Sequence, residues 1–151
     1  MKLVIDDIRI RSGSNDKPIV DGSLYLAIRD ACFPAPGWFD LISTVLEDWT
    51  PKLISFAKNH TETCSFCFFD GPYGILLIRV SAGEVRVTCS DGIRKVIQDE
   101  PINFPEFLVS FAKVLRNLAT AFYHQGNAAQ YGNLISELGR VSKELQSIAY
   151  H

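Results

Sequence analysis

The chain has 151 residues, which is the length of one domain, and we expect residues 1–151 to fold as a single unit. Hydrophobic residues make up 47% and charged residues 21% of the sequence, a balance that excludes disorder and allows a well-packed core. Fifteen Lys and Arg stand against seventeen Asp and Glu, so the net charge is −2. A protein that binds nucleic acid without regard to its sequence carries a basic excess, and we therefore expect no nucleic-acid partner.

Targeting signals are not evident in the sequence. The first apolar run breaks at Asp6 and Asp7, too early for the core of a signal peptide. The most apolar stretch, residues 74–80, is only as long as a strand and contains Arg79. We expect a cytoplasmic protein without membrane contact.

The first third of the chain predicts a hairpin followed by a helix. Strands are indicated over residues 2–10 and 23–29, joined by the polar loop 11–17. Apolar residues at steps of three and four predict a helix from about Trp38 to residue 58. Because Pro51 interrupts this pattern, we expect a kink or break just before it.

The middle of the chain predicts an antiparallel meander. Strands are expected over residues 63–69, 75–81 and 84–89, connected by short turns, with a weaker strand over 94–98. Two further helices follow. Asn103 and Glu106 have the spacing of a capping box, with Ile102 and Phe107 placed as a hydrophobic staple.

Gly126 is expected to end the first of these C-terminal helices. The last helix has an apolar stripe, which consists of Leu134, Leu138, Val141, Leu145 and Ile148. The predicted fold class is α+β: an antiparallel meander of about five to six strands with three helices packed on it, the last two C-terminal.

The four cysteines are expected to be buried structural thiols. Cys64 and Cys67 form a C-x-x-C, but on a strand residues three apart point to opposite faces and cannot share a metal ion. We expect no disulfide, no metal and no cofactor. Cys32, just before Phe33, stays open as an alternative nucleophile because it lies where a strand gives way to a helix.

Motifs of catalysis are missing from the sequence, which has no G-x-S-x-G and no phosphate-binding glycine loop. We therefore expect a protein that is not an enzyme. Adjacent carboxylates diverge on both helices and strands, so the acidic pairs suit a surface that attracts a basic partner better than acid–base catalysis. The candidate partner-binding residues are Glu47, Asp48, Asp70, Tyr73, Asp99 and Glu100.

Aromatic residues gather in one predicted strand, where Phe66, Phe68 and Phe69 place rings on both faces. A central strand covered on both sides explains this pattern, and a partner-binding face is the alternative. Tyr73, at the tip of the following turn, is expected to be the most exposed of these rings.

Two segments carry a family resemblance. The run Cys32-Phe33-Pro34-Ala35-Pro36-Gly37-Trp38-Phe39-Asp40, followed by Val45-Leu46 and Trp49, and then Asp70-Gly71-Pro72-Tyr73, resembles short bacterial immunity-type proteins that accompany polymorphic toxins. The resemblance implies a protein that binds a cognate toxin domain. It also implies that Phe33, Trp38 and Trp49 are core anchors and that Asp40 stands in the first turn of a helix.

The leading hypothesis is a non-enzymatic binding protein of the immunity type, which neutralises a toxin domain by steric and electrostatic occlusion. One alternative is a small ligand-binding domain or enzyme with a pocket between sheet and helices, around Cys32, Arg79 or Arg86. Another is a secretion-chaperone-like or structural homodimer that uses the apolar stripe of the last helix.

Overall fold

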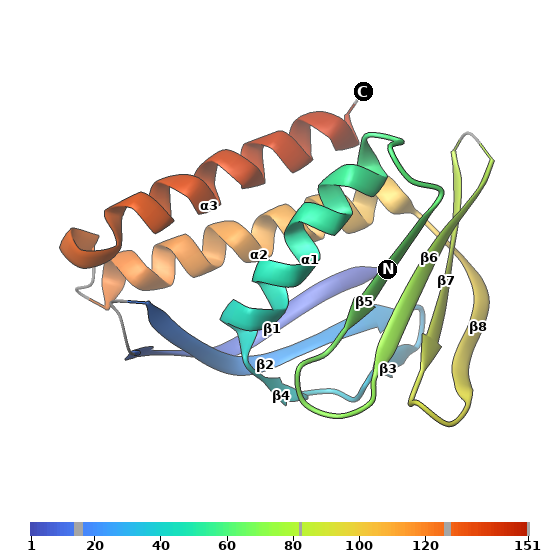
Figure 1. Cartoon of the computed structure of the whole chain (residues 1–151), viewed down its shortest axis with the longest axis horizontal. Helices are drawn as coiled ribbons and strands as arrows, with labels where there is room; N and C mark the ends of the chain where they lie inside the picture. The colour runs from blue at the N-terminus through green and yellow to red at the C-terminus, as the bar shows by residue number, and fades with distance from the viewer. Residues whose placement is uncertain (14–16, 82, 126–127, 151) are drawn as a thin grey trace.

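The computed structural model describes residues 1–13, 17–81, 83–125 and 128–150 (Figure 1). It confirms the α+β class, with three helices of which the last two are C-terminal. The elements in chain order are β1 (Lys2–Ser12), β2 (Pro18–Ile28), β3 (Ala31–Phe33), β4 (Phe39–Asp40), α1 (Ile42–Ala57), β5 (Thr63–Cys67), β6 (Gly74–Ser81), β7 (Glu84–Ser90), β8 (Lys95–Ile102), α2 (Phe104–His124) and α3 (Ala128–Ala149).

The strands form two antiparallel sheets of four, where the sequence predicted one sheet of five to six strands. In the first sheet β1 pairs with β2, which also pairs with the short strands β3 and β4. The second sheet is the predicted meander, in the order β5-β6-β7-β8. Helix α1 lies between the two groups of strands in the sequence, and each strand pairs with strands of its own group that are near it in the chain.

The two C-terminal helices lie side by side and antiparallel, and α2 covers the first sheet (Figure 1). The backbone N–H of Leu3 in β1 donates to the hydroxyl of Ser110 in α2 at 3.0 Å. The fully buried hydroxyl of Ser142 in α3 donates to the carbonyl of Ala112 in α2 at 2.8 Å. These bonds fix the register of the helix pair on the sheet.

One cluster of buried side chains runs through both sheets and all three helices. Its largest fully buried members are Trp49, Phe33, Phe56, Phe66, Phe107, Phe111 and Phe122. Val141 and Leu145 of the predicted apolar stripe also belong to it, so α3 packs its stripe against α2 within the chain. Gly126, the predicted end of α2, lies outside the described residues, and α2 ends at His124.

Helix α1 differs from its prediction at two points. It begins at Ile42, because residues 39–40 form β4 against β2 instead of a first helical turn. It also runs unbroken past Pro51, so the expected break is wrong. The buried face of α1, which includes Trp49 and Leu53, continues on both sides of the proline, and its packing holds the helix in one piece.

The edges of the second sheet also differ from the prediction. Strand β5 ends at Cys67, and it is an edge strand, so the interpretation of the aromatic run as a central strand is wrong. The weak strand predicted over residues 94–98 becomes the longer β8. The cap of α2 forms as predicted, since the side chain of Asn103 accepts from the backbone N–H of Glu106 at 3.1 Å.

Candidate functional site

Residues of the two sequence segments 32–49 and 70–73 meet where the two sheets come together. The ring of Tyr73 packs against Phe33 at 5.8 Å and against Trp38 at 4.7 Å between ring centroids. Phe33 belongs to β3 and Tyr73 to the turn before β6, so these rings join the first sheet to the second. Tyr73 is half-buried among them, and the expectation that it is the most exposed ring is wrong.

Trp49 of α1 completes this aromatic joint. Its ring lies 5.0 Å from Phe66 and 5.1 Å from Phe68, and its indole N–H donates to the carbonyl of Cys67 at 2.8 Å. We use the name aromatic joint for the set Phe33, Trp38, Trp49, Phe66, Phe68 and Tyr73. Phe33 and Trp49 are core anchors as expected, whereas Trp38 is half-buried at the rim.

Asp40 holds the turn that follows β5. Its carboxylate is 1% exposed and accepts the backbone N–H groups of Leu41 at 2.7 Å, Phe69 at 3.1 Å and Asp70 at 3.3 Å. Asp40 lies in β4, before the helix, which corrects the expectation of a first-turn residue. In the same turn Gly71 has φ +83°, and a Cβ there would come within 2.7 Å of the Tyr73 ring.

An exposed surface lies over this joint. Phe69 follows the turn from β5 with 59% of its side chain exposed, and Asp70 beside it is exposed too. Asp48 is exposed on the flank of α1 that faces β5, close enough for its charge to act on Cys64. We use the name acidic–aromatic face for the exposed pair Phe69 and Asp70 together with Asp48 on the adjacent flank of α1.

The other predicted site residues lie elsewhere. Glu47, one helical position from Asp48, points to the other side of α1, 3.8 Å from the Lys17 ammonium group. Asp99 pairs with Arg86 at 2.9 Å on β8. The Glu100 carboxylate, also on β8, lies 2.5 Å from the guanidinium of Arg29. Asp48 also has a cationic partner, Lys52 of the same helix at 2.7 Å, whereas no ion pair of Asp70 is found among the described residues.

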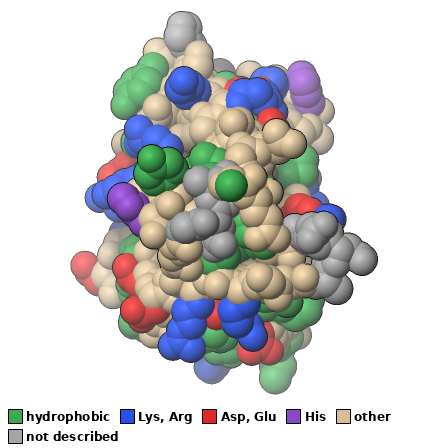
Figure 2. Space-filling view, turned by 90° about the vertical axis from the view of Figure 1, so that its left-hand side faces the viewer, with side chains coloured by type: hydrophobic (Ala, Val, Ile, Leu, Met, Phe, Trp, Pro, Cys, Tyr) green, Lys and Arg blue, Asp and Glu red, His purple; other side chains and the backbone are tan. Residues whose placement is uncertain are grey.

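Surface charge is mixed at the end of the molecule where α2 turns toward α3. Figure 2 shows hydrophobic, basic and acidic side chains interspersed there, so neither sign dominates the described part of that face. This agrees with the small net charge and leaves any electrostatic preference to local groups.

The cysteines are free among the described residues, and only part of the expectation of buried thiols holds. Cys64 and Cys89 are buried, and burial raises the pKa of their thiols to about 11 and about 12, which suits neither as a nucleophile. Cys67 is exposed, on the opposite face of β5 from Cys64, as the strand geometry predicted. Cys32 is half-buried in β3, opposite Ala27 of β2.

Metal ligands do not gather anywhere in the described part of the chain, where no three His, Cys, Asp or Glu residues are placed to share an ion. Within the same residues, no helix has the length and apolar character needed to cross a membrane.

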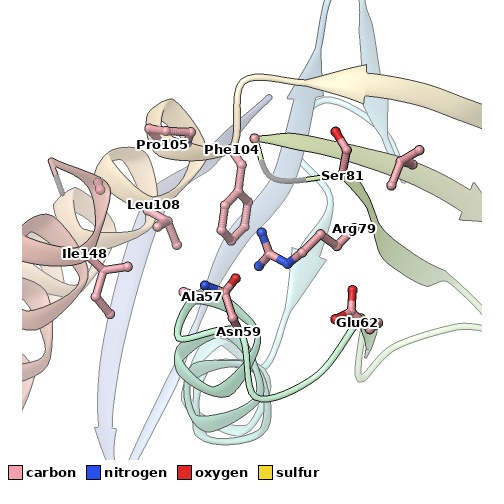
Figure 3. A pocket seen from close by; sticks show the side chains of 12 residues that line it. Ala57, Asn59, Glu62, Arg79, Ser81, Phe104, Pro105, Leu108 and Ile148 are labelled. Carbon is pink, nitrogen blue, oxygen red and sulfur yellow. The ribbon is translucent and has the colours of Figure 1, made fainter.

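A cavity of about 580 Å³ opens at the far end of α1, between β6, the start of α2 and the end of α3 (Figure 3). Arg79 reaches into it from β6, and its guanidinium points toward the ring of Phe104 and the last turn of α1. From the sequence, Arg79 was one of three residues around which a ligand pocket was considered. Arg86, another of the three, lies outside this cavity and is ion-paired on β7.

Phe69 was not among the six candidate partner-binding residues, although the sequence contains a signal for it. Cys64, Phe66 and Phe68 alternate along and just beyond β5, and all three are buried. The next residue in such an alternation points away from the core. An apolar residue in that position therefore indicates an exposed ring.

Comparison of the chain with family models, with curated proteins and with solved structures gives no match.

Proposed function

We propose that this chain is a cytoplasmic, non-enzymatic binding protein of the immunity type, which blocks a partner toxin domain with its acidic–aromatic face. The observation that carries the proposal is the exposed ring of Phe69 next to the exposed carboxylate of Asp70 in the turn after β5. A few residues, often aromatic, supply most of the binding energy at a protein interface, and flanking charges guide association.

The backbone beneath this face is held in place before any partner arrives. Asp40 binds the N–H groups of Phe69 and Asp70, and the aromatic joint packs directly below them. A surface that is ordered in the free protein loses little conformational entropy on binding, so its contacts are converted into affinity. Asp40, Asp70 and Tyr73 also belong to the two segments on which the resemblance to immunity-type proteins rests.

The test is co-expression with the protein encoded next to this chain, followed by measurement of the affinity of the purified pair. Phe69→Ala and Asp48→Lys are each expected to weaken the complex about tenfold or more, about 1.4 kcal/mol. Asp48→Lys is also expected to slow association most strongly at low salt.

Glu47→Lys is the matched control, because it makes the same charge change one helical position away on the other side of α1. It is expected to change the affinity less than threefold, on the order of half a kcal/mol. If no neighbouring toxin domain forms a complex, the proposed function is wrong. If Asp48→Lys and Glu47→Lys weaken the complex equally, this face is not the binding surface.

A further inference from the structure

The charge of Arg79 is not neutralised by the rest of the described chain. No carboxylate in that part of the chain lies within 4.0 Å of its guanidinium, and its Nε is buried without a hydrogen-bond partner. Five other arginines are in ion pairs: Arg11, Arg29, Arg86, Arg94 and Arg140. Arg9 and Arg116 have no carboxylate partner among the described residues either, but both are exposed to solvent, whereas Arg79 is half-buried. A half-buried cation without a counter-ion is unfavourable and attracts an anion.

Structural contacts use only part of this guanidinium. Its Nη2 donates to the carbonyl of Phe56 at 2.7 Å, at the negative end of α1. Its Cζ atom lies 4.7 Å from the centroid of the Phe56 ring and 5.9 Å from the centroid of the Phe104 ring. The other amino group, Nη1, has no hydrogen-bond partner among the described residues, so the arginine retains donors for a further acceptor.

The cavity around Arg79 offers one cation, polar side chains that include Asn59 and Ser81, and an apolar wall on one side. Phe104 and Leu108 of α2 and Ile148 of α3 line one side (Figure 3). Glu62 lies on the other side of Arg79, away from these side chains. Its carboxylate disfavours a second negative charge in the cavity, so a monoanion fits better than a phosphate dianion.

We infer that this cavity binds a small amphipathic carboxylate, with the carboxylate on Arg79 and the apolar tail against Phe104, Leu108 and Ile148. A volume of about 580 Å³ is within the range of small-molecule sites. Arginine suits a carboxylate because its planar donors can bond both oxygens. This site is separate from the acidic–aromatic face, so the ligand proposal does not depend on the proposed toxin partner.

The test is titration of the full-length protein with octanoate, and with 1-octanol as a neutral ligand of the same length, followed by amide chemical shifts. Octanoate is expected to bind about tenfold or more tightly than 1-octanol, because a charge-assisted hydrogen bond contributes that much. The shifted amides are expected at the ends of α1, β6 and α3.

Variants locate the site. Arg79→Gln is expected to weaken octanoate binding about ten- to hundredfold. Arg94→Gln, which removes an equally charged but exposed arginine outside the cavity, is expected to leave it unchanged. Ala149→Phe places a large side chain in the cavity and keeps Arg79, and it is expected to abolish octanoate binding. This variant tests the location of the site even if Arg79→Gln does not fold.

Equal affinity for octanoate and 1-octanol would overturn the inference. So would equal behaviour of Arg79→Gln and Arg94→Gln, or undiminished binding by Ala149→Phe. Glu62→Gln supplies a check of sign, because loss of the repelling carboxylate is expected to tighten octanoate binding.

Discussion

The buried carboxylate of Asp40 holds the turn after β5 in place, a contact that the sequence pattern does not predict. It is a charged side chain that is 1% exposed, and it has no cation among the ion-pair partners found in the described chain. Backbone N–H groups stabilise it instead, those of Leu41, Phe69 and Asp70. The side chain thereby joins the start of α1 to the turn after β5, which is distant in sequence.

Asp40→Ala is expected to lower the free energy of unfolding by about 3 kcal/mol, because it leaves buried N–H groups without acceptors. Asp40→Asn keeps one acceptor oxygen and is expected to lose about half as much. Urea denaturation measures both values. Asp48→Ala, which breaks an exposed pair with Lys52 within α1, is the control and is expected to cost below about 0.5 kcal/mol. A loss for Asp40→Ala no larger than this control would contradict the role of its carboxylate.

At the scale of elements, predictions from the sequence succeeded where local chemistry decides. The start of α2 was predicted correctly because an Asn cap and a proline in the first turn act within four residues. The start of α1 was not, because residues 39–40 pair with β2, whose contribution no local pattern reveals. The same reason explains β3, three residues long, and the division of the strands into two sheets.

The candidate site was predicted only in part for a related reason. Glu47, Asp99 and Glu100 pair with Lys17, Arg86 and Arg29 in turn. Asp48 pairs with Lys52, and only Asp70 of the five predicted carboxylates has no ion pair among the described residues. Which carboxylate finds a cation depends on tertiary neighbours, and a list of acidic residues does not contain that information.

The cap of α2 allows a quantitative test at this scale. Asn103→Ala removes the acceptor for the Glu106 N–H and is expected to lower the free energy of unfolding by about 1 kcal/mol. Asn103→Asp retains the acceptor and adds a charge that favours the helix N-terminus, so its stability is expected to equal or exceed that of the parent. Chemical denaturation compares the two. The capping role fails if the alanine and aspartate variants are equally stable.

At the scale of the whole molecule, the aromatic joint makes two sheets behave as parts of one core. Phe33 from the first sheet and Phe66 from the second both belong to the continuous buried cluster, and Trp49 of α1 lies against Phe66. The ion pair between Arg29 and Glu100 adds a second connection, from the end of β2 to β8. Because side chains of both sheets are buried in this one cluster, unfolding of either sheet exposes the core side chains of the other.

The chain is therefore expected to unfold in one cooperative step. Trp38 and Trp49 both lie in the aromatic joint, so tryptophan fluorescence reports the contact between the sheets, while far-UV circular dichroism is dominated by the helices. If the molecule is a single unit, the two signals give the same midpoint and the same slope in urea. A fluorescence transition at lower urea than the loss of helix would mean that the second sheet separates first. Because both tryptophans report the same boundary, such a gap in midpoints would identify the joint itself as the weak point of the fold.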